Sequence, residues 1–149
     1  AVRNIMKLEE ISDLWEDDAK IDRTELGNEA TKIPQLHNKY FKIFSKERLI
    51  LKKLVEDRKQ FKLLKFEYYM GTLDEETLKE RNWEPNPRKI LRSDIDMYID
   101  GDKEYIDLNL KIAYQQEKID FLESIIRSLN SRGYEISSAI KWEQFKVGA

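Results

Sequence analysis

A seven-residue repeat near the C-terminus constrains the fold more than any other feature of this 149-residue chain. Between Leu108 and Leu129 the core positions are spaced four and three apart, with Ile at the three a positions, Leu at three of the four d positions and Gln115 at the other. The pattern suits a helix seam within one chain or between chains. Because few helices are expected in one chain, we predict self-association. The predicted oligomerisation residues are Leu108, Ile112, Ile119, Leu122, Ile126 and Leu129, with Trp142 and Phe145 of a last helix.

Helical periodicity also dominates the N-terminal half. Apolar residues at helical spacing in 8–15 predict an amphipathic helix of about ten residues. The segment 22–25 reads as an N-cap aspartate followed by an acid at N3, and it predicts a helix running toward Phe44. Pro34 should kink or divide that helix. No Gly or Pro interrupts 39–70, which predicts further helix.

Several short signals predict where these helices end. Gly71 suits the left-handed position after a helix, and so does Gly133. Residues 74–78 indicate a turn or a short helix, and 83–87 form the clearest loop. A serine at 137–138 could cap a last helix. With no credible strand longer than a few residues, we predict an all-α fold.

Composition excludes several kinds of function. The chain has no Cys, so it has neither disulfides nor Cys-ligated zinc, and its five Gly are too scattered for a phosphate-binding loop. His37 is the only histidine and is expected to be an ordinary surface or half-buried residue.

No apolar run is long enough to cross a membrane, and no secretory signal is visible, so we expect a cytoplasmic protein. Residues 1–5 are expected to be extraneous or upstream of the native start. We expect no cofactor.

An acidic cluster between 94 and 107 permits two metal-dependent alternatives. Counted from Asp96, its acids and Gly101 follow part of the spacing of a calcium loop, but Tyr98 and the shorter Asp107 break the pattern. A small nuclease could instead use Asp94, Asp96 and Asp100. We favour a solvated turn whose negative charge caps the next helix, and we predict no metal site.

Charge is strongly segregated along the chain. Ten basic and three acidic residues lie in 39–65, although the net charge of the whole chain is −2. Lysines and arginines at helical spacing, followed by adjacent tyrosines, are typical of proteins that bind single strands without sequence preference. The alternative is a helix that lysines merely solvate. The predicted DNA-binding residues are Lys39, Lys42, Lys46, Arg48, Lys52, Lys53, Arg58, Lys59, Lys62, Lys65, Tyr68 and Tyr69.

Three short motifs resemble those of a known family. They are the residues 21–26 followed by Glu29-Ala30, the stretch LLKFEYYMG at 63–71, and SRGYEI at 131–136 followed by Phe145 and Gly148. Together, and in this order, they resemble the UvsY recombination mediators of tailed, T4-like phages. The family's DNA-binding stretch reads Leu-Lys-x-Arg-x-Asp-Tyr-Tyr-x-Gly. In this chain Lys65 stands at the Arg of the family stretch and Glu67 at its Asp. The Lys of the family stretch is replaced by Leu63, although Lys62 is adjacent. The two tyrosines and the glycine match as Tyr68, Tyr69 and Gly71.

The resemblance implies a non-enzymatic protein of phage homologous recombination and DNA repair. Such a protein binds single-stranded DNA, forms homo-oligomeric rings of six or seven subunits, and contacts a RecA-like phage recombinase and the phage single-strand-binding protein, helping the first replace the second. It would act in the cytoplasm of the infected bacterial host. We expect one helical domain at 6–149, with a DNA-binding half at 6–71 and an assembly half at 88–149. The alternative function is a helical scaffold that does not bind DNA.

Overall fold

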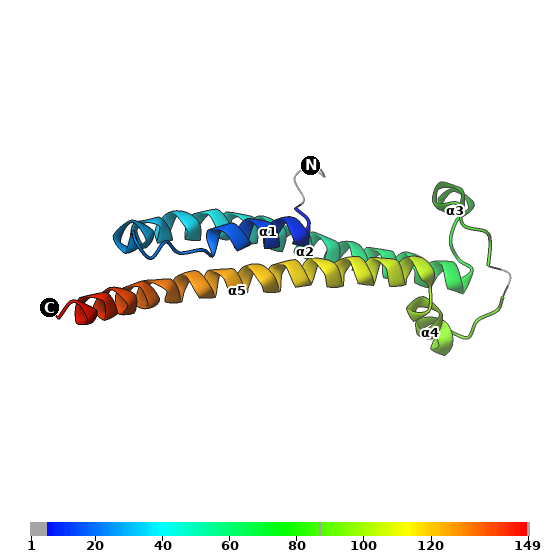
Figure 1. Cartoon of the computed structure of the whole chain (residues 1–149). Helices are drawn as coiled ribbons and strands as arrows, with labels where there is room; N and C mark the ends of the chain where they lie inside the picture. Colours follow the sequence, from blue (N-terminus) through cyan, green and yellow to red (C-terminus); the bar gives the residue numbers. More distant parts are fainter. Residues whose placement is uncertain (1–5, 87, 149) are drawn as a thin grey trace. The chain divides into compact units, whose positions relative to one another are not determined.

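The computed structural model describes residues 6–86 and 88–148, and all regular elements in those ranges are helical, as predicted. The expectations for residues 1–5 and for Pro87 lie outside these ranges. Two compact units are formed: unit 1 from Ala1–Ile50 and Gln115–Ala149, and unit 2 from Leu51–Tyr114. The elements are α1 (Leu8–Asp18), α2 (Leu26–Met70), α3 (Glu75–Arg81), the 3-10 turn η2 (Arg92–Asp94), α4 (Ile95–Asp100) and α5 (Lys103–Lys146). Figure 1 labels the five α-helices.

The helix α2 is longer and begins later than the sequence predicted. It continues through Pro34, which neither divides it nor marks its end. Asp22 is not its N-cap. The Asp22 carboxylate accepts hydrogen bonds from the backbone N–H and the hydroxyl of Thr24, and so forms a local turn ahead of the helix. The capping pattern therefore identified a real turn but placed the start of the helix too early.

The helix α5 likewise passes through the predicted break at Gly133. This glycine does not have a positive φ, whereas Gly71 and Gly148 do. No separate last helix begins at Ser137 or Ser138, because α5 continues to Lys146. Since a helix interior tolerates a glycine at a cost of only about 1 kcal/mol, packing of the surrounding residues overrides this local signal.

The predicted helix end at Gly71 is confirmed, and residues 74–78 begin a short helix, one of the two outcomes that the sequence left open. Gly71 ends α2 with φ of 76°, and its N–H donates to the carbonyl of Tyr68 while that of Thr72 donates to Glu67, both at 3.1 Å. Asp74 caps α3, because its carboxylate accepts a hydrogen bond from the N–H of Thr77.

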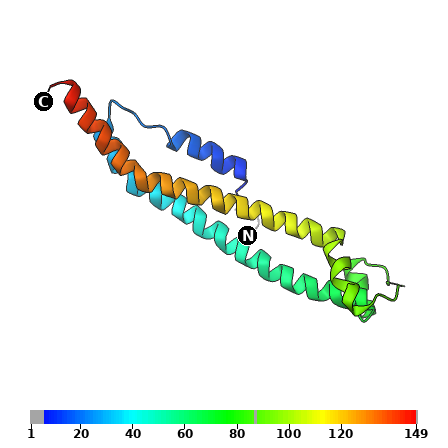
Figure 2. The same cartoon turned by 90° about the horizontal axis from the view of Figure 1, so that it is seen from below.

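Unit 1 packs α1 and the unit 1 parts of α2 and α5 around one core. Within it, the α2 and α5 segments lie side by side and run in opposite directions (Figures 1 and 2). Its α1 joins them through the edge-to-face contact of Trp15 with Tyr40, whose ring centroids are 5.4 Å apart. The core is filled by Ile11, Tyr40, Phe44, Ile119, Leu122, Ile125, Leu129 and Ile136.

The expectation that the heptad seam lacks partners in its own chain is therefore wrong. Its side chains Ile112, Ile119, Leu122 and Leu129 are 0–8% exposed in the single chain, the first within unit 2 and the others within unit 1. Leu108 and Ile126 are half-buried. The facing helix is α2, which the sequence already predicted to be helical without a break from 39 to 70 and which contacts α5 in both units. These residues stabilise the fold of one chain.

Polar side chains cross the core of unit 1. The ammonium of Lys118 lies 2.6 Å from a carboxylate oxygen of Glu47, and both side chains are 1% exposed. Gln115 donates from its amide to the backbone carbonyl of Glu47 at 2.8 Å. These contacts fix the register of the two helix segments, because a shift along either axis would leave a buried charge without a partner.

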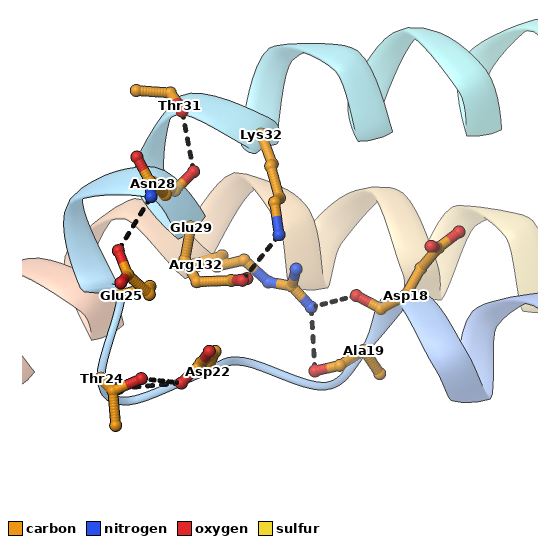
Figure 3. Close-up of polar contacts among 10 residues, drawn as sticks. All are labelled: Asp18, Ala19, Asp22, Thr24, Glu25, Asn28, Glu29, Thr31, Lys32 and Arg132. Atoms are coloured by element: carbon orange, nitrogen blue, oxygen red, sulfur yellow. Dashed lines mark hydrogen bonds and ion pairs between the residues drawn. The ribbon is translucent and has the colours of Figure 1, made fainter.

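Arg132 closes the other end of unit 1. Its guanidinium donates to the carbonyls of Asp18 and Ala19 at 3.0 and 3.1 Å, where α1 ends (Figure 3). The same side chain is buried and lies over the ring of Trp15. Arg132 thus satisfies backbone carbonyls that the helix end leaves free, and it ties the loop before α2 to α5.

Unit 2 has a separate, smaller core. Ile95 and Ile99 of α4 are fully buried against Tyr105 of α5. Four half-buried side chains from α2 and the loop before η2 pack around them: Phe61, Phe66, Tyr69 and Ile90. The acidic segment that follows Ser93 thus folds as a short helix with two buried isoleucines.

Candidate nucleic-acid interface

The predicted DNA-binding cations of unit 1 lie on α2. Lys42, Lys46 and Arg48 are exposed, and the guanidinium of Arg48 lies 5.1 Å from the ring centroid of Phe44. Lys39 is different, because its ammonium lies 2.7 Å from the carboxylate of Asp18. Burial alone would raise the pKa of Asp18, but hydrogen bonds from Lys39 and Tyr40 hold that pKa below its ordinary value. Lys39 is therefore held by α1 and is the least available of the four.

Unit 2 presents a second group of cations along α2. Lys52, Lys53 and Lys62 are exposed and form no ion pair with any residue in the described ranges. Lys59 is exposed and pairs with Glu56 on the same helix at 3.0 Å. Such an exposed pair contributes little to stability and can exchange for a phosphate.

Arg58 faces inward instead. Its guanidinium donates to the amide oxygen of Asn109 on α5 at 3.1 Å, and the side chain is half-buried. A guanidinium that bridges two helices inside unit 2 positions those helices and offers a phosphate only part of its donors.

Lys65 does not lie where the sequence reading placed it. Its side chain is 3% exposed, and its ammonium contacts Asp102 at 3.0 Å and Glu104 at 3.3 Å. The same ammonium lies 3.8 Å from the ring centroid of Trp83 and 5.3 Å from that of Tyr68. Lys65 is therefore closed off from any phosphate in this conformation, and its role in DNA binding stays a prediction. The periodicity could not reveal the residues that cover it.

The adjacent tyrosines are also engaged within unit 2. The Tyr68 hydroxyl donates to the carbonyl of Glu84, and that of Tyr69 to the carboxylate of Asp102, both at 2.7 Å. Burial raises the pKa of both tyrosines, and the Asp102 carboxylate adds to the effect. Both rings are half-buried, so neither is a freely exposed stacking surface.

The acidic cluster serves the fold. Asp102 accepts a hydrogen bond from the N–H of Tyr105 and so caps α5, as predicted, but the segment before it is a short helix and not the solvated turn that was expected. Burial opposes its ionisation, but hydrogen bonds from Tyr69, the Tyr105 N–H and Lys65 hold the pKa of Asp102 below its ordinary value. Within residues 6–86 and 88–148, no group of three acidic or histidine side chains is arranged to hold a metal ion. Asp94, Asp96 and Asp100, named for the nuclease alternative, are exposed.

The C-terminal end of α5 carries an exposed aromatic pair. Trp142 and Phe145 stack with their ring centroids 5.6 Å apart, and they are 55% and 71% exposed. Tyr134 and Val147 add further exposed apolar surface to this end of unit 1. Of the predicted oligomerisation residues, Trp142 and Phe145 are the most exposed, whereas Leu108 and Ile126 are half-buried.

His37 is half-buried and stacks on Phe41, with ring centroids 5.9 Å apart and an interplanar angle of 11°.

The described helices include none that is both long enough and apolar enough to cross a bilayer.

Comparisons with known proteins place the chain in a family. A family profile described as "Recombination, repair and ssDNA binding protein UvsY" matches residues 14–149. The chain belongs to the UvsY family. It is 22% identical to the recombination protein uvsY of Enterobacteria phage T4 over 143 residues, which is 96% of this chain and 99% of that protein.

The fold of the UvsY family is also matched. A crystal structure of the bacteriophage T4 recombination mediator protein UvsY, lattice type IV, superposes with a TM-score of 0.82 at 21% identity, covering 94% of this chain and 99% of that one. The lattice type II crystals give the same TM-score and identity over 96% and 99% of the two chains. At this identity the agreement concerns the fold.

The sequence reading missed Trp83, Glu104, Lys118 and Arg132. Trp83 and Glu104 are far from Lys65 in sequence, and no periodic signal connects them. A signal for the other two was present. Lys118, Ile125 and Arg132 recur every seven residues beside the a positions, and all three are buried. This repeat widens the buried stripe of α5, and a wider stripe indicates two neighbouring helices instead of one.

Proposed function

We propose that this chain is a recombination mediator that binds single-stranded DNA. The observation that carries the proposal is the set of exposed cations on α2 in a member of the UvsY family. These are Lys42, Lys46 and Arg48 in unit 1 and Lys52, Lys53, Lys59 and Lys62 in unit 2. Phosphate binding by such side chains is independent of sequence and weakens steeply with salt, because it releases counterions from the strand.

Mediation follows from this mode of binding. A strand held at its phosphates by several copies of one basic surface is bent away from the path that a single-strand-binding protein imposes. We propose that this loosening lets a RecA-like phage recombinase replace the single-strand-binding protein, without any chemical step by the chain itself. This would occur in the cytoplasm of an infected bacterium.

Multiplicity is part of the proposal. One helix with a few lysines binds weakly, whereas several linked copies act together because each further contact is intramolecular. We propose that Trp142 and Phe145, stacked and exposed at the end of α5, form part of the contact between subunits of a six- or seven-membered ring. The residues 6–71 would then carry most of the DNA contacts, and 88–149 most of the assembly.

The DNA-binding proposal is tested by changing Lys52 and Lys53 together to Gln. Single-strand affinity should fall about tenfold at low salt, and the slope of log K against log salt should become shallower by about 1.4, since each lost phosphate contact contributes about 0.7. Fluorescence anisotropy with a labelled oligonucleotide measures both. The matched control changes Lys103 and Lys111, which are exposed on α5, to Gln. Equal losses of DNA affinity in the two double variants would refute the proposal that DNA binds specifically through α2. No salt-dependent binding by the unmodified chain would favour the scaffold alternative.

The assembly proposal is tested by changing Trp142 and Phe145 together to Ala. Because both side chains are exposed, helix content should stay the same while the mass in sedimentation velocity falls. Leu49→Ala with Leu110→Ala removes comparable exposed apolar surface elsewhere and should leave the mass unchanged. An unchanged mass in the Trp142 and Phe145 variant would place the subunit contact elsewhere.

A further inference from the structure

A short segment of unit 2 covers the end of α2 that bears Lys65. This segment, 72–86, is called the strap; it includes α3 and ends at Asn86. Its helix has no buried residue. Two hydrogen bonds attach the strap to the α2 tyrosines: the Tyr68 hydroxyl donates to the Glu84 carbonyl, and the Asn86 amide donates to the Tyr69 carbonyl at 3.2 Å. A segment with so few buried contacts opens at low cost.

Trp83 is the main anchor of the strap. Its ring centroid lies 5.2 Å from that of Tyr68 and 6.1 Å from that of Phe61, and its face receives the Lys65 ammonium at 3.8 Å. An aromatic base of a single strand makes these same contacts, stacking on aromatic rings beside a cation. Trp83 therefore occupies a site whose chemistry suits a nucleobase.

The carboxylate of Glu104 lies where the phosphate of a nucleotide would lie if Trp83 were its base. One of its carboxylate oxygens accepts a hydrogen bond from the Trp83 indole at 2.6 Å and lies 3.3 Å from the Lys65 ammonium. The carboxylate thus stands where a phosphate oxygen would bind, directly beside the ring that stands for a base. The Glu104 side chain is 53% exposed, so it can turn to solvent once the indole leaves. Asp102, which is 9% exposed and caps α5, would remain to orient the lysine.

We propose that the strap is an autoinhibitory cover that single-stranded DNA displaces. In the closed form, Trp83 and Glu104 hold the places of a base and a phosphate against Tyr68 and Lys65. In the open form, the rings of Phe61 and Tyr68 become available for stacking, next to the Lys65 ammonium. This inference rests on the proposed DNA-binding function and adds a barrier to it, since affinity is reduced by the fraction of molecules that are closed.

The first test changes Trp83 to Ala in the full chain and measures binding of a labelled oligo-dT by anisotropy at a fixed protein concentration. Removing the anchor opens the strap, so affinity should rise about three- to tenfold, in proportion to the open fraction. Reduced affinity would overturn the proposal, because Trp83 would then be a DNA-binding residue and not a cover.

The second test keeps the anchor and removes only the competing charge. Glu104→Gln is nearly isosteric and preserves an acceptor for the indole, so the fold should not depend on it. Its matched control is Glu80→Gln, which makes the same change of net charge on α3. Glu104→Gln should bind oligo-dT several-fold more tightly than the control. Equal affinities of these two variants would show that only net charge matters, and would overturn the proposal.

Hydrogen exchange gives a readout that a purely structural strap would not change. Saturating oligo-dT should speed amide exchange in peptides from 72–86 of the unmodified chain, while exchange in α2 slows or stays the same. Slower or unchanged exchange in 72–86 would refute displacement. If the unmodified chain fails to bind oligo-dT at all, the proposed function itself fails, which is a different outcome from bound DNA with a closed strap.

Discussion

Unit 1 and unit 2 each bury a lysine against carboxylates, but the two sites are built differently. In unit 1, Lys118 and Glu47 are both 1% exposed, and they meet between two long helix segments. In unit 2, Lys65 is buried beneath the strap, and its partner Glu104 is half open to solvent. The Lys118 ammonium also donates to the Met6 carbonyl, whereas that of Lys65 faces aromatic rings.

The first ion pair fixes the register of two helix segments, whereas the second lies at the site that we propose DNA opens. A buried pair between two helices adds little net stability, because removing both charges from water costs about as much as their attraction returns. The second carboxylate oxygen of Glu47 has no hydrogen-bond partner within residues 6–86 and 88–148, which adds to that cost. Lys118 and Glu47 instead fix one alignment of the unit 1 segments of α2 and α5. Lys65 is covered by the strap, whose helix has no buried residue, and our proposal requires this segment to move away.

The largest expected effect comes from breaking the unit 1 pair. Lys118→Met leaves the Glu47 carboxylate buried without a counter-charge, and the free energy of unfolding should fall by about 3–5 kcal/mol. Urea denaturation followed by circular dichroism at one protein concentration measures it. Lys111→Met makes the same change one heptad earlier at an exposed position and should stay within about 0.5 kcal/mol of the parent. A loss no larger than that of the control would mean that water reaches Glu47.

Removing both charges separates the pair's contribution from the cost of an orphaned carboxylate. Lys118→Met combined with Glu47→Leu should recover most of the lost stability, because the replacement side chains are apolar and of similar size. If the double variant is as unstable as the single one, the polar contacts with Gln115 and Met6 carry more of the stability than the ion pair does.

A smaller effect is expected from the unit 2 lysine. Lys65→Met removes one partner of Asp102, but that carboxylate keeps hydrogen bonds from the Tyr69 hydroxyl and the Tyr105 N–H. The free energy of unfolding should therefore fall by about 2 kcal/mol, the usual contribution of a hydrogen bond to a charged group. Hydrogen exchange should locate the loss in 95–105. A loss equal to that of Lys118→Met would show that both lysines are equally structural, and would remove the contrast between the units.

Local signals were enough to predict much of the fold. The all-helical class, the first helix and the left-handed end at Gly71 all depend on residues within a few positions of one another. The basic character of α2 was equally visible, and most of its predicted lysines are exposed. The family resemblance is confirmed by the match over residues 14–149.

The failures that matter most for the site concern contacts between residues distant in sequence. Periodicity showed that the heptad face is buried, but it could not show that α2 covers it within the same chain. It could not show the closure of Lys65 either, because Glu104 lies in the first turn of α5 and Asp102 just before that helix, both far from Lys65 in sequence. The same limitation led to the assignment of a helix end at Gly133, where tertiary packing keeps α5 continuous.

The two units also use glycine differently, and this gives the smallest predicted effects. Gly133 lies inside α5 in unit 1, and a Cβ added there would meet no atom within 4 Å. Gly133→Ala should therefore raise the free energy of unfolding by about 0.5–1 kcal/mol, since alanine loses less backbone entropy in a helix. A Cβ added at Gly71 in unit 2 would also meet no atom within 4 Å, but the φ of 76° there is a left-handed conformation that disfavours any residue with a side chain.

Gly71→Ala should accordingly lower the free energy of unfolding by about 1 kcal/mol, the cost of a left-handed residue with a Cβ. Paired thermal melts at one protein concentration compare the two variants, which make the same atomic change in opposite backbone conformations. If α5 continues through Gly133 and α2 ends at Gly71, the two substitutions must change the free energy of unfolding in opposite directions. A destabilising Gly133→Ala would mean that this position is strained, or that its surface is covered by another subunit at the same end of α5 as Trp142 and Phe145.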